Sequence, residues 1–146
     1  MAYLHSNLDA ASTLTIANNH AGLKDGLAWL GAWLKRHGAG EKTNDRAHLV
    51  FEEIVTNIIR YAFSDNSEHP IAVGVRLEGG DVTLTFGDDG RPFDPRSEPS
   101  PPPPGSLEMA PIGGRGLLLV RRAARSLDYK RTKEGHNLLS VTLANA

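Results

Sequence analysis

A glutamate and an asparagine placed four residues apart are the side chains of this sequence that first suggest chemistry. Glu53 and Asn57 lie within the segment Glu52–Tyr61. On a helix, both would project on the same side, roughly 6 Å apart along the axis. A carboxylate and an amide so arranged suit a base for proton transfer and a ligand for Mg²⁺. The alternative is a pair of solvated side chains, which is common on surface helices.

Apolar residues around that pair predict the helix that must hold it. Thr43, Asn44 and Asp45 are the expected N-cap residues, and the helix is expected to run to about Phe63. Glu53 and Asn57 fall just outside the apolar face, at its rim. At about 100° per residue that face consists of Ala47, Val50, Phe51, Ile54, Val55, Ile58, Tyr61 and Ala62.

Two later stretches extend the pattern. An Asp-Asp-Gly turn at residues 88–90 follows an alternating apolar run, as expected at the end of a strand. A glycine cluster at residues 113–116 opens an apolar helix, where unencumbered backbone N–H groups can bind phosphate oxygens. Taken singly, the first is typical of a simple reverse turn and the second of a loop.

Composition limits the classes of protein to consider. The 146 residues are 40% hydrophobic and 23% charged, which predicts one domain over residues 1–146. No apolar run approaches the ~20 residues of a membrane span, and the N-terminus lacks the features of a signal peptide. With no cysteine, the chain fits a reducing, cytoplasmic compartment. A net charge of −1 argues against a general nucleic-acid binder, and the six scattered histidines argue against a histidine metal cluster.

The periodicities along the chain predict the order strand, helix, helix, hairpin, helix, hairpin. A strand is expected from Ser12, a helix across Leu23–Leu34, and a β-hairpin over residues 71–86. A third helix is expected at Gly116–Arg125, followed by closing strands at 126–131 and 137–143. This order predicts an α/β (α+β) two-layer sandwich, in which three helices cover one face of a mixed, mainly antiparallel sheet.

The segment between Arg91 and Pro111 has no periodicity and contains the run Pro101–Pro104. Consecutive prolines exclude helix and interior strand, and they favour an extended polyproline conformation. A loop of that length is usually functional or disordered. A proline-rich ligand for an SH3-like domain is the alternative that composition allows.

Two groups of side chains have both a structural and a binding interpretation. Trp29 and Trp33 form a second stripe on the first helix and are expected in the core, with a partner surface as the alternative. Arg121, Arg122 and Arg125 lie toward a helix C-terminus, where positive charge is stabilising in itself. Binding of nucleic acid or of an acidic partner is the alternative for these arginines.

The acidic helix, the aspartate turn and the glycine cluster occur in the order of the N, G1 and G2 boxes of the GHKL superfamily of histidine-kinase-like ATPases, which they resemble. The motifs are similar to those of the anti-sigma-factor serine/threonine kinase branch. They read Glu-x-Val-Thr-Asn, then Asp-x-Gly-x-Pro-Phe-Asp-Pro, then Gly-Gly-x-Gly-x-x-Leu-Val. The resemblance covers about Leu14 to Leu143 and includes the closing Gly135-His-Asn-Leu. The proline-rich loop and Arg60-Tyr61 depart from the usual pattern.

That resemblance implies a Bergerat-type ATP-binding fold, with residues 94–112 as the ATP lid. Asp88 would accept a hydrogen bond from the adenine amino group, and Gly90 would let the backbone approach the base. Asn57 would hold Mg²⁺, and Glu53 would act as general base. Arg115 would lie near the γ-phosphate, although the family often has an apolar residue there. The implied nucleotide-binding residues are Asn57, Asp88, Gly90, Gly113, Gly114, Arg115, Gly116 and Leu117.

The function implied by the resemblance is that of a cytoplasmic protein serine/threonine kinase using ATP and Mg²⁺. It would phosphorylate an anti-sigma-factor antagonist protein and sequester a sigma factor, as a homodimer, without direct contact to nucleic acid or membrane. One alternative is an ATP-binding interaction module without kinase activity. A second is the detached catalytic domain of a histidine kinase, which the Pro-Phe-Asp-Pro wording and the lack of a phosphoacceptor helix pair disfavour.

Overall fold

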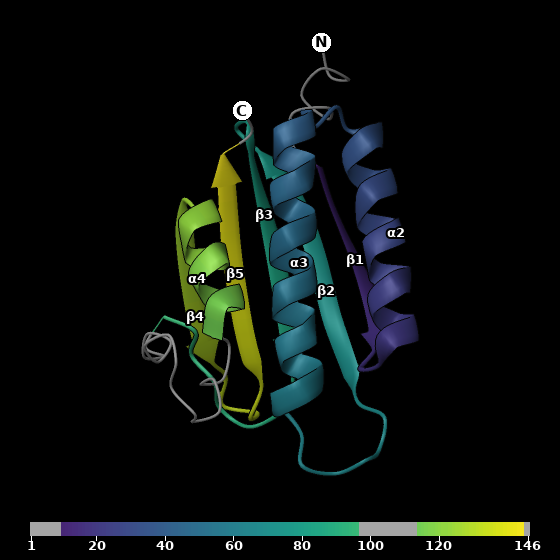
Figure 1. The fold of residues 1–146 in the computed structure, drawn as a ribbon, viewed down its shortest axis with the longest axis vertical. Coiled ribbons are helices and arrows are strands. Elements are labelled where there is room, and N and C mark those ends of the chain that lie inside the picture. Colours follow the sequence, from purple (N-terminus) through teal and green to yellow (C-terminus); the bar gives the residue numbers. More distant parts are fainter. Residues whose placement is uncertain (1–9, 97–113, 145–146) are drawn as a thin grey trace, which may run out of the picture.

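The structure is a computed structural model that describes residues 10–96 and 114–144. It consists of a five-stranded sheet with helices on one face. Figure 1 shows the two layers, with the helices lying side by side across the sheet. The two-layer prediction is confirmed. In chain order the elements are β1 (Ala10–Ala17), α2 (His20–Arg36), α3 (Glu41–Tyr61), β2 (Pro70–Glu78), β3 (Asp81–Asp88), α4 (Gly114–Ala123), β4 (Ser126–Arg131) and β5 (Asn137–Ala144).

The strands lie in the order β1-β2-β3-β5-β4, and each of the four pairings in the described residues is antiparallel. A mixed, mainly antiparallel sheet was expected, and among the described strands every pairing is antiparallel. Because β3 and β5 are neighbours, residues far apart in the chain face each other at their ends. Asp88 stands opposite Asn137, although 49 residues separate them. This register brings a strand end and a hairpin turn together at one edge of the helix layer.

Helix α3 crosses the middle of the sheet and provides a rigid support for the predicted chemical pair. Its buried face includes Phe51 and Ile54, as the apolar arc predicted. The Phe51 ring lies 5.7 Å from that of Phe86 on β3, centroid to centroid. It also fills the space beside Gly26 of α2, where an added Cβ would come within 2.6 Å of a ring carbon. Truncating such a core aromatic typically costs about 3–5 kcal/mol.

Helix ends differ from expectation in three places. Helix α3 begins at Glu41 after Gly40, which makes no side-chain cap hydrogen bond, so the predicted N-cap at residues 43–45 is wrong. Thr43 is instead buried in the first turns of the helix. The acidic Glu41 lies in the first turn, where the positive end of the helix dipole stabilises a negative charge. The ends of α3 and α4 lie at Tyr61 and Ala123, two residues before those predicted.

The first helix covers the predicted range Leu23–Leu34, and its aromatic stripe agrees with expectation. Asn19 caps α2, because its side-chain oxygen accepts a hydrogen bond from the Gly22 N–H at 2.9 Å. Trp33 is only 2% exposed and stacks on His37, and Trp29 is half-buried against the core, which confirms the core interpretation.

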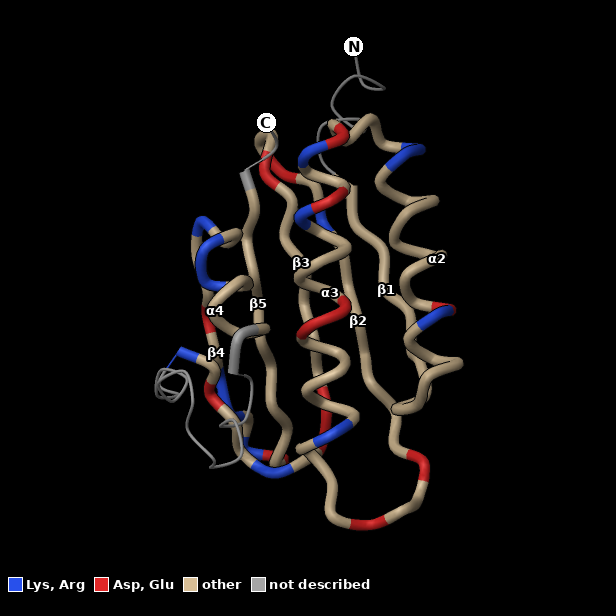
Figure 2. The backbone as a smooth tube through the Cα atoms, viewed as in Figure 1, with Lys and Arg blue, Asp and Glu red and all other residues tan. Residues whose placement is uncertain are grey.

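Charge is distributed unevenly over the helix layer. Figure 2 shows acidic residues along the middle of α3 and basic residues at the C-terminal end of α4. The two arginines in the last turn of α4 are Arg121 and Arg122, and Arg125 beyond it pairs with Asp81 at 2.8 Å. Within residues 10–96 and 114–144, none of the helices is both long and apolar enough to cross a membrane.

Candidate nucleotide-binding site

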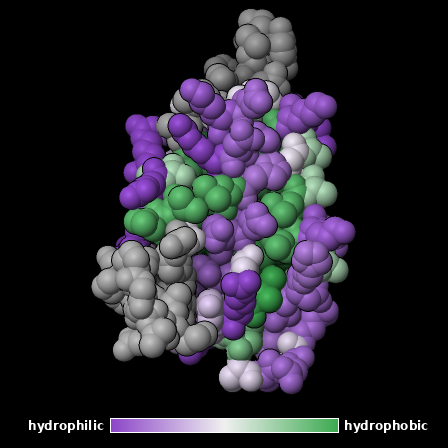
Figure 3. Space-filling view, in the orientation of Figure 1, coloured by the Kyte–Doolittle hydropathy of each residue, from purple (hydrophilic) through white to green (hydrophobic). Residues whose placement is uncertain are grey.

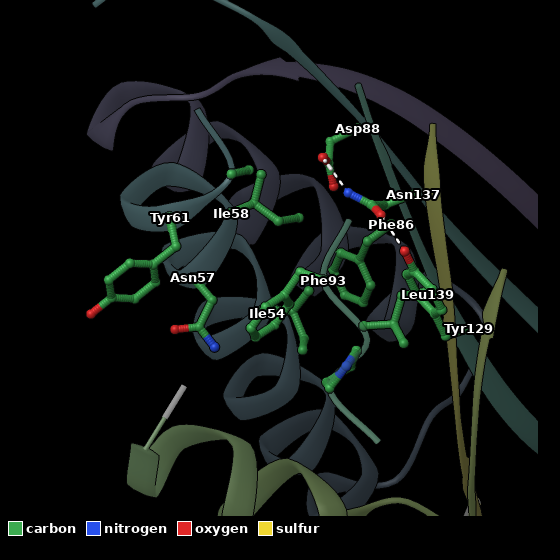
Figure 4. A pocket seen from close by; sticks show the side chains of 12 residues that line it. Ile54, Asn57, Ile58, Tyr61, Phe86, Asp88, Phe93, Tyr129, Asn137 and Leu139 are labelled. Atoms are coloured by element: carbon green, nitrogen blue, oxygen red, sulfur yellow. Dashed lines mark hydrogen bonds between the residues drawn. The ribbon is translucent and has the colours of Figure 1, made fainter. Parts of the chain in front are cut away.

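A cleft between α3 and the sheet contains two of the residues singled out from the sequence. Asn57 of α3 and Asp88 of β3 both line it, and its volume is about 460 Å³ including the open mouth. Figure 4 shows Asp88 beside Asn137 at one end and Asn57 toward the other, with apolar side chains between them. We call these the β3 end and the α4 end of the cleft. Apolar walls with a few convergent polar groups are typical of small-molecule sites.

Asp88 is the acidic group of the β3 end. The residue is 5% exposed, and its Oδ1 accepts hydrogen bonds from the Gly90 N–H at 2.8 Å and from Asn137 Nδ2 at 3.1 Å. Burial is the main cause that raises the pKa of this carboxyl above its usual range. None of the hydrogen bonds formed among the described residues uses Oδ2, so that oxygen is the acceptor left for a ligand.

Gly90 keeps the turn after Asp88 tight. A Cβ at this position would lie 2.6 Å from both the Cβ and the carbonyl oxygen of Ala62, at the end of α3. The next residue, Arg91, donates its backbone N–H to the Ala62 carbonyl at 3.0 Å. Only glycine permits this approach, so the turn is held against α3. This contact gives Gly90 a packing role in addition to the approach to a base that the sequence suggested.

Asn137 is a residue of the β3 end that sequence reasoning missed. It is 6% exposed, and besides Asp88 its Nδ2 donates to the Arg91 carbonyl at 2.8 Å. Its Oδ1 accepts from the Tyr129 hydroxyl and, at 3.2 Å, from the Arg131 guanidinium. The available signal was an asparagine opening a strand after Gly135, but its pairing with Asp88 depends on the β3–β5 register.

At the α4 end, just beyond the residues that line the cleft, Glu53 lies against the first turn of α4. A Cβ on Gly116 would come within 2.1 Å of Glu53 Oε2, so the carboxylate occupies the space that this glycine leaves open. The half-buried Glu53 therefore meets the end of α4 where backbone N–H groups have no intrahelical acceptor. A helix N-terminus of this kind binds phosphate oxygens readily.

The structure describes the other predicted residues around the glycine cluster only in part. Gly113 lies outside the described residues. Gly114 and Arg115 belong to α4, but the side chain of Arg115 is outside the described part, so its predicted phosphate contact stays a prediction. The Leu117 side chain is 2% exposed and belongs to the core, which leaves only its backbone for a ligand.

Asn57 carries an unsatisfied donor. Its Nδ2 is buried and has no hydrogen-bond partner among the described residues. Leaving a buried donor unpaired typically costs about 1–3 kcal/mol, so such a group in a cleft points to an acceptor on a ligand. Figure 4 shows the amide reaching toward the cleft from α3. The arrangement fits a nucleotide with Mg²⁺, because an amide offers an N–H for a phosphate oxygen and an oxygen for the metal.

The chain that leaves the β3 end is anchored at several points before residue 97. Phe93 and Pro95 line the cleft, and Arg121 of α4 donates to the Pro95 carbonyl, with Nε at 3.2 Å. Arg96 pairs with Asp94 at 2.9 Å and lies 6.0 Å from the ring centroid of Tyr129. The rest of the predicted lid, from residue 97 to 112, lies outside the described residues.

The sheet is antiparallel and carries its helices on one face, and a cleft between α3 and the sheet opens toward the start of α4. This architecture suits the binding of a nucleotide. Residues 16–143 match the family described as the histidine kinase-like ATPase domain, and the chain belongs to that family. The resemblance inferred from the three sequence boxes is thereby confirmed.

The chain is similar to one protein in sequence and to two solved structures in fold. The chain is 31% identical over 134 residues to the serine/threonine-protein kinase BtrW of Bordetella bronchiseptica, covering 92% of this chain and 94% of that protein. Its fold is similar to a solved structure of RsbU and RsbW domains from Mycobacterium tuberculosis, with a TM-score of 0.65, 18% identity, and coverage of 92% of this chain and 32% of the other. A SiaB–SiaC complex from Pseudomonas aeruginosa gives a TM-score of 0.56 at 15% identity, covering 97% and 94%.

Proposed function

We propose that this protein is an ATP-dependent protein serine/threonine kinase that acts as an anti-sigma regulatory factor. It would phosphorylate an anti-sigma-factor antagonist protein and sequester a sigma factor. The observation that carries the proposal is the α4 end of the cleft, where a half-buried carboxylate and an unsatisfied buried amide lie next to a helix N-terminus. Similarity to a relative named as a serine/threonine-protein kinase supports it.

The chain's own groups suggest a division of labour. Asp88 Oδ2 accepts the hydrogen bond of the adenine amino group, and the N-terminus of α4 binds phosphate oxygens. Asn57 donates its free N–H to a phosphate oxygen and offers its amide oxygen to Mg²⁺. When bound, Mg²⁺ supplies neutralisation of the triphosphate charge. Positioning and charge neutralisation are most of what phosphoryl transfer requires.

Glu53 is proposed to take the proton of the attacking hydroxyl. The hydroxyl oxygen of a serine or threonine forms a bond to the γ-phosphorus, and the bond from that phosphorus to the β–γ bridging oxygen breaks. The proton passes to Glu53, and ADP leaves with the bridging oxygen. The carboxylate is placed for this because Gly116 leaves space for it directly at the start of α4. A positioned base of this kind typically contributes about 10²–10⁴-fold to the rate.

The experiment measures transfer of label from γ-labelled ATP to the antagonist protein, together with ATP affinity. Glu53→Gln is expected to bind ATP as wild type does and to transfer phosphate at least about 100-fold more slowly. Glu52→Gln is the matched control, since Glu52 is an exposed neighbour on the same helix. Normal transfer by Glu53→Gln would remove the base assignment. ATP binding without any transfer by the wild-type protein would leave an ATP-dependent interaction module instead.

The surface around Glu53 supports a protein as the phosphate acceptor. Leu119 of α4 is 41% exposed, although it is a large apolar residue. Figure 3 shows an apolar area over α4 that extends toward α3 on the helix face. A hydroxyl that reaches Glu53 must approach past this surface, so an apolar face on the partner would be buried there during transfer.

The remaining parts of the proposal rest on the resemblance. We propose that residues 1–146 act as one domain, that residues 94–112 close over ATP as a lid, and that the protein works as a cytoplasmic homodimer. None of the helices labelled in Figure 1 covers the outer face of the sheet, and this face offers room for such a dimer. Sedimentation of the full chain at several concentrations tests the dimer directly, and a monomer at all of them would exclude it.

A further inference from the structure

Asn137 has every one of its side-chain hydrogen-bonding positions occupied. Nδ2 donates to Asp88 Oδ1 at 3.1 Å and to the Arg91 carbonyl at 2.8 Å, while Oδ1 accepts from Tyr129 and Arg131. An asparagine amide has two N–H donors and two acceptor lone pairs, so this set is complete. The residue is 6% exposed and cannot exchange these partners for water.

The orientation of this amide follows from the chemistry of its neighbours. The Arg131 guanidinium is a donor only, so the Asn137 atom beside it must be the oxygen. The Arg91 carbonyl is an acceptor only, so the atom beside it must be the nitrogen. A flipped amide would set oxygen against carbonyl and nitrogen against guanidinium. The group that faces Asp88 is therefore an N–H donor.

This donor determines how Asp88 meets a ligand. Together with the Gly90 N–H it occupies Oδ1, and it leaves Oδ2 as the acceptor in the cleft. Burial is the largest effect and raises the pKa of Asp88, and the neighbouring Asp89 adds to this rise. The hydrogen bonds from Asn137 and Gly90 and the charge of Arg131 act in the opposite direction and favour the ionised form. A carboxylate held ionised can only accept hydrogen bonds, whereas a protonated one could also donate.

We infer that Asn137 is a specificity-determining residue, which holds Asp88 as an obligate acceptor and so selects a 6-amino purine over a 6-oxo purine. This inference rests on the proposed function. Adenine presents an N–H donor at position 6, and hypoxanthine presents a carbonyl oxygen there. An ionised Asp88 accepts from the first and repels the second. Sites built to pair with one polar group reject the analogue that leaves it unpaired.

Inosine triphosphate is the informative probe, because it differs from ATP in the 6-oxo group and the N1 proton but adds no 2-amino group that could clash. The dissociation constants of ATP and inosine triphosphate are measured by calorimetry with Mg²⁺ on the full chain. Wild-type protein is expected to prefer ATP by at least about tenfold, the range of a hydrogen bond to a charged group. No preference in a wild type that binds ATP would overturn the inference and leave the proposed function standing.

Asn137→Asp replaces the donor by an acceptor of the same size. Two facing carboxylates share a proton, so Asp88 gains donor character and the preference for ATP should fall about tenfold. Asn66→Asp makes the same charge change on an exposed loop and should keep the wild-type preference. A purely structural role would weaken both nucleotides equally. A folded Asn137→Asp with the wild-type ratio of the two constants would overturn the inference alone.

The double variant Tyr129→Phe/Arg131→Met decides the matter if Asn137→Asp fails to fold, as judged by far-UV circular dichroism. It removes both donors that orient the Asn137 oxygen while Asn137 itself stays, and it also removes the bond from Arg131 to the Gly90 carbonyl and the charge of Arg131 near Asp88. The amide is then held by Asp88 and Arg91 alone, and the preference for ATP should fall by about threefold to tenfold. An unchanged preference in this folded variant would overturn the inference. Failure of the wild-type protein to bind ATP would overturn the inference together with the proposed function.

Discussion

The two ends of the cleft differ in how far their hydrogen bonds are satisfied without a ligand. At the β3 end, Asp88 and Asn137 are engaged with each other and with the turn at Gly90. At the α4 end, the Asn57 amide nitrogen is buried without a partner, and Glu53 faces the start of a helix. Under the proposed function, the first end is preformed for the adenine base. The second end leaves the Asn57 N–H unpaired for a phosphate oxygen and its amide oxygen available to Mg²⁺.

At both ends the polar groups lower the stability of the folded state. Their presence therefore indicates a function other than packing. A buried carboxylate with a raised pKa lowers the stability of the folded state at neutral pH, and an unpaired buried N–H does so by about 1–3 kcal/mol. Core residues of the same size would avoid both costs. Locally unfavourable groups that converge on one cleft are typical of binding sites.

Asp88→Asn should give the largest effect, because it removes the acceptor of the β3 end. ATP affinity is expected to fall about 100-fold, since a hydrogen bond to a charged group is lost and a donor now faces the adenine amine. The melting temperature should stay level or rise, because a buried charge disappears while the bonds from Gly90 and Asn137 can persist on Oδ1. Calorimetry and thermal unfolding measure the two quantities, and Asp89→Asn on the exposed neighbour is the control. ATP binding at wild-type strength would show that the base lies elsewhere.

Asn57→Leu tests whether the Asn57 N–H at the α4 end is unpaired in the absence of a ligand. Without ligand the variant should be more stable by about 1 kcal/mol, because an apolar side chain of similar size replaces an unsatisfied donor. Mg²⁺-dependent ATP affinity should fall about tenfold. Denaturant unfolding and binding with and without Mg²⁺ give both numbers. A loss of stability in the absence of ligand would mean that the Asn57 N–H is satisfied in solution and would remove the contrast between the two ends.

Gly116→Ala should act on transfer more than on binding. The added methyl must displace the Glu53 carboxylate, the movable end of a flexible side chain, so stability is kept while the base moves. Alanine also favours a helix by about 1 kcal/mol over glycine. We expect phosphate transfer to slow about fivefold to tenfold and ATP affinity to stay nearly unchanged. Label transfer measures the first quantity and calorimetry the second. Gly87→Ala is the control, since an added Cβ there would make only ordinary van der Waals contacts, the nearest at 3.7 Å. Equal loss of affinity in Gly116→Ala would indicate a packing defect.

The sequence predicted the α4 end better than the β3 end, for a physical reason. Glu53 and Asn57 share one helix face, so local periodicity was enough to place them together. Asp88 could be identified at the end of its strand. Its partner Asn137 could not, because their pairing depends on which strands are neighbours and in which register. The same holds for Gly90 against Ala62, a contact between two distant turns.

The prediction for pH has the smallest expected effect, and its sign distinguishes binding from folding. Burial raises the folded-state pKa of Asp88 above its unfolded value. The contribution of this group to stability is therefore fully present below the unfolded pKa and is lost as pH rises through the folded pKa. If Asp88 accepts the adenine amino group as proposed, ATP binding requires its ionised form. The affinity should then change in the opposite direction and weaken as pH falls through that window, by at most about tenfold per pH unit.

The control for this pH dependence is Asp88→Asn, whose residual affinity should show no such change over the same window. Asp89 and Arg131 also act on Asp88, but they are present in both proteins and cancel in the comparison. The ratio of wild-type to variant affinity therefore reports the ionisation of the β3 end alone. A ratio that is constant with pH would mean that the charge of Asp88 does not change in this window, and the predicted link between its ionisation and ATP affinity would be wrong.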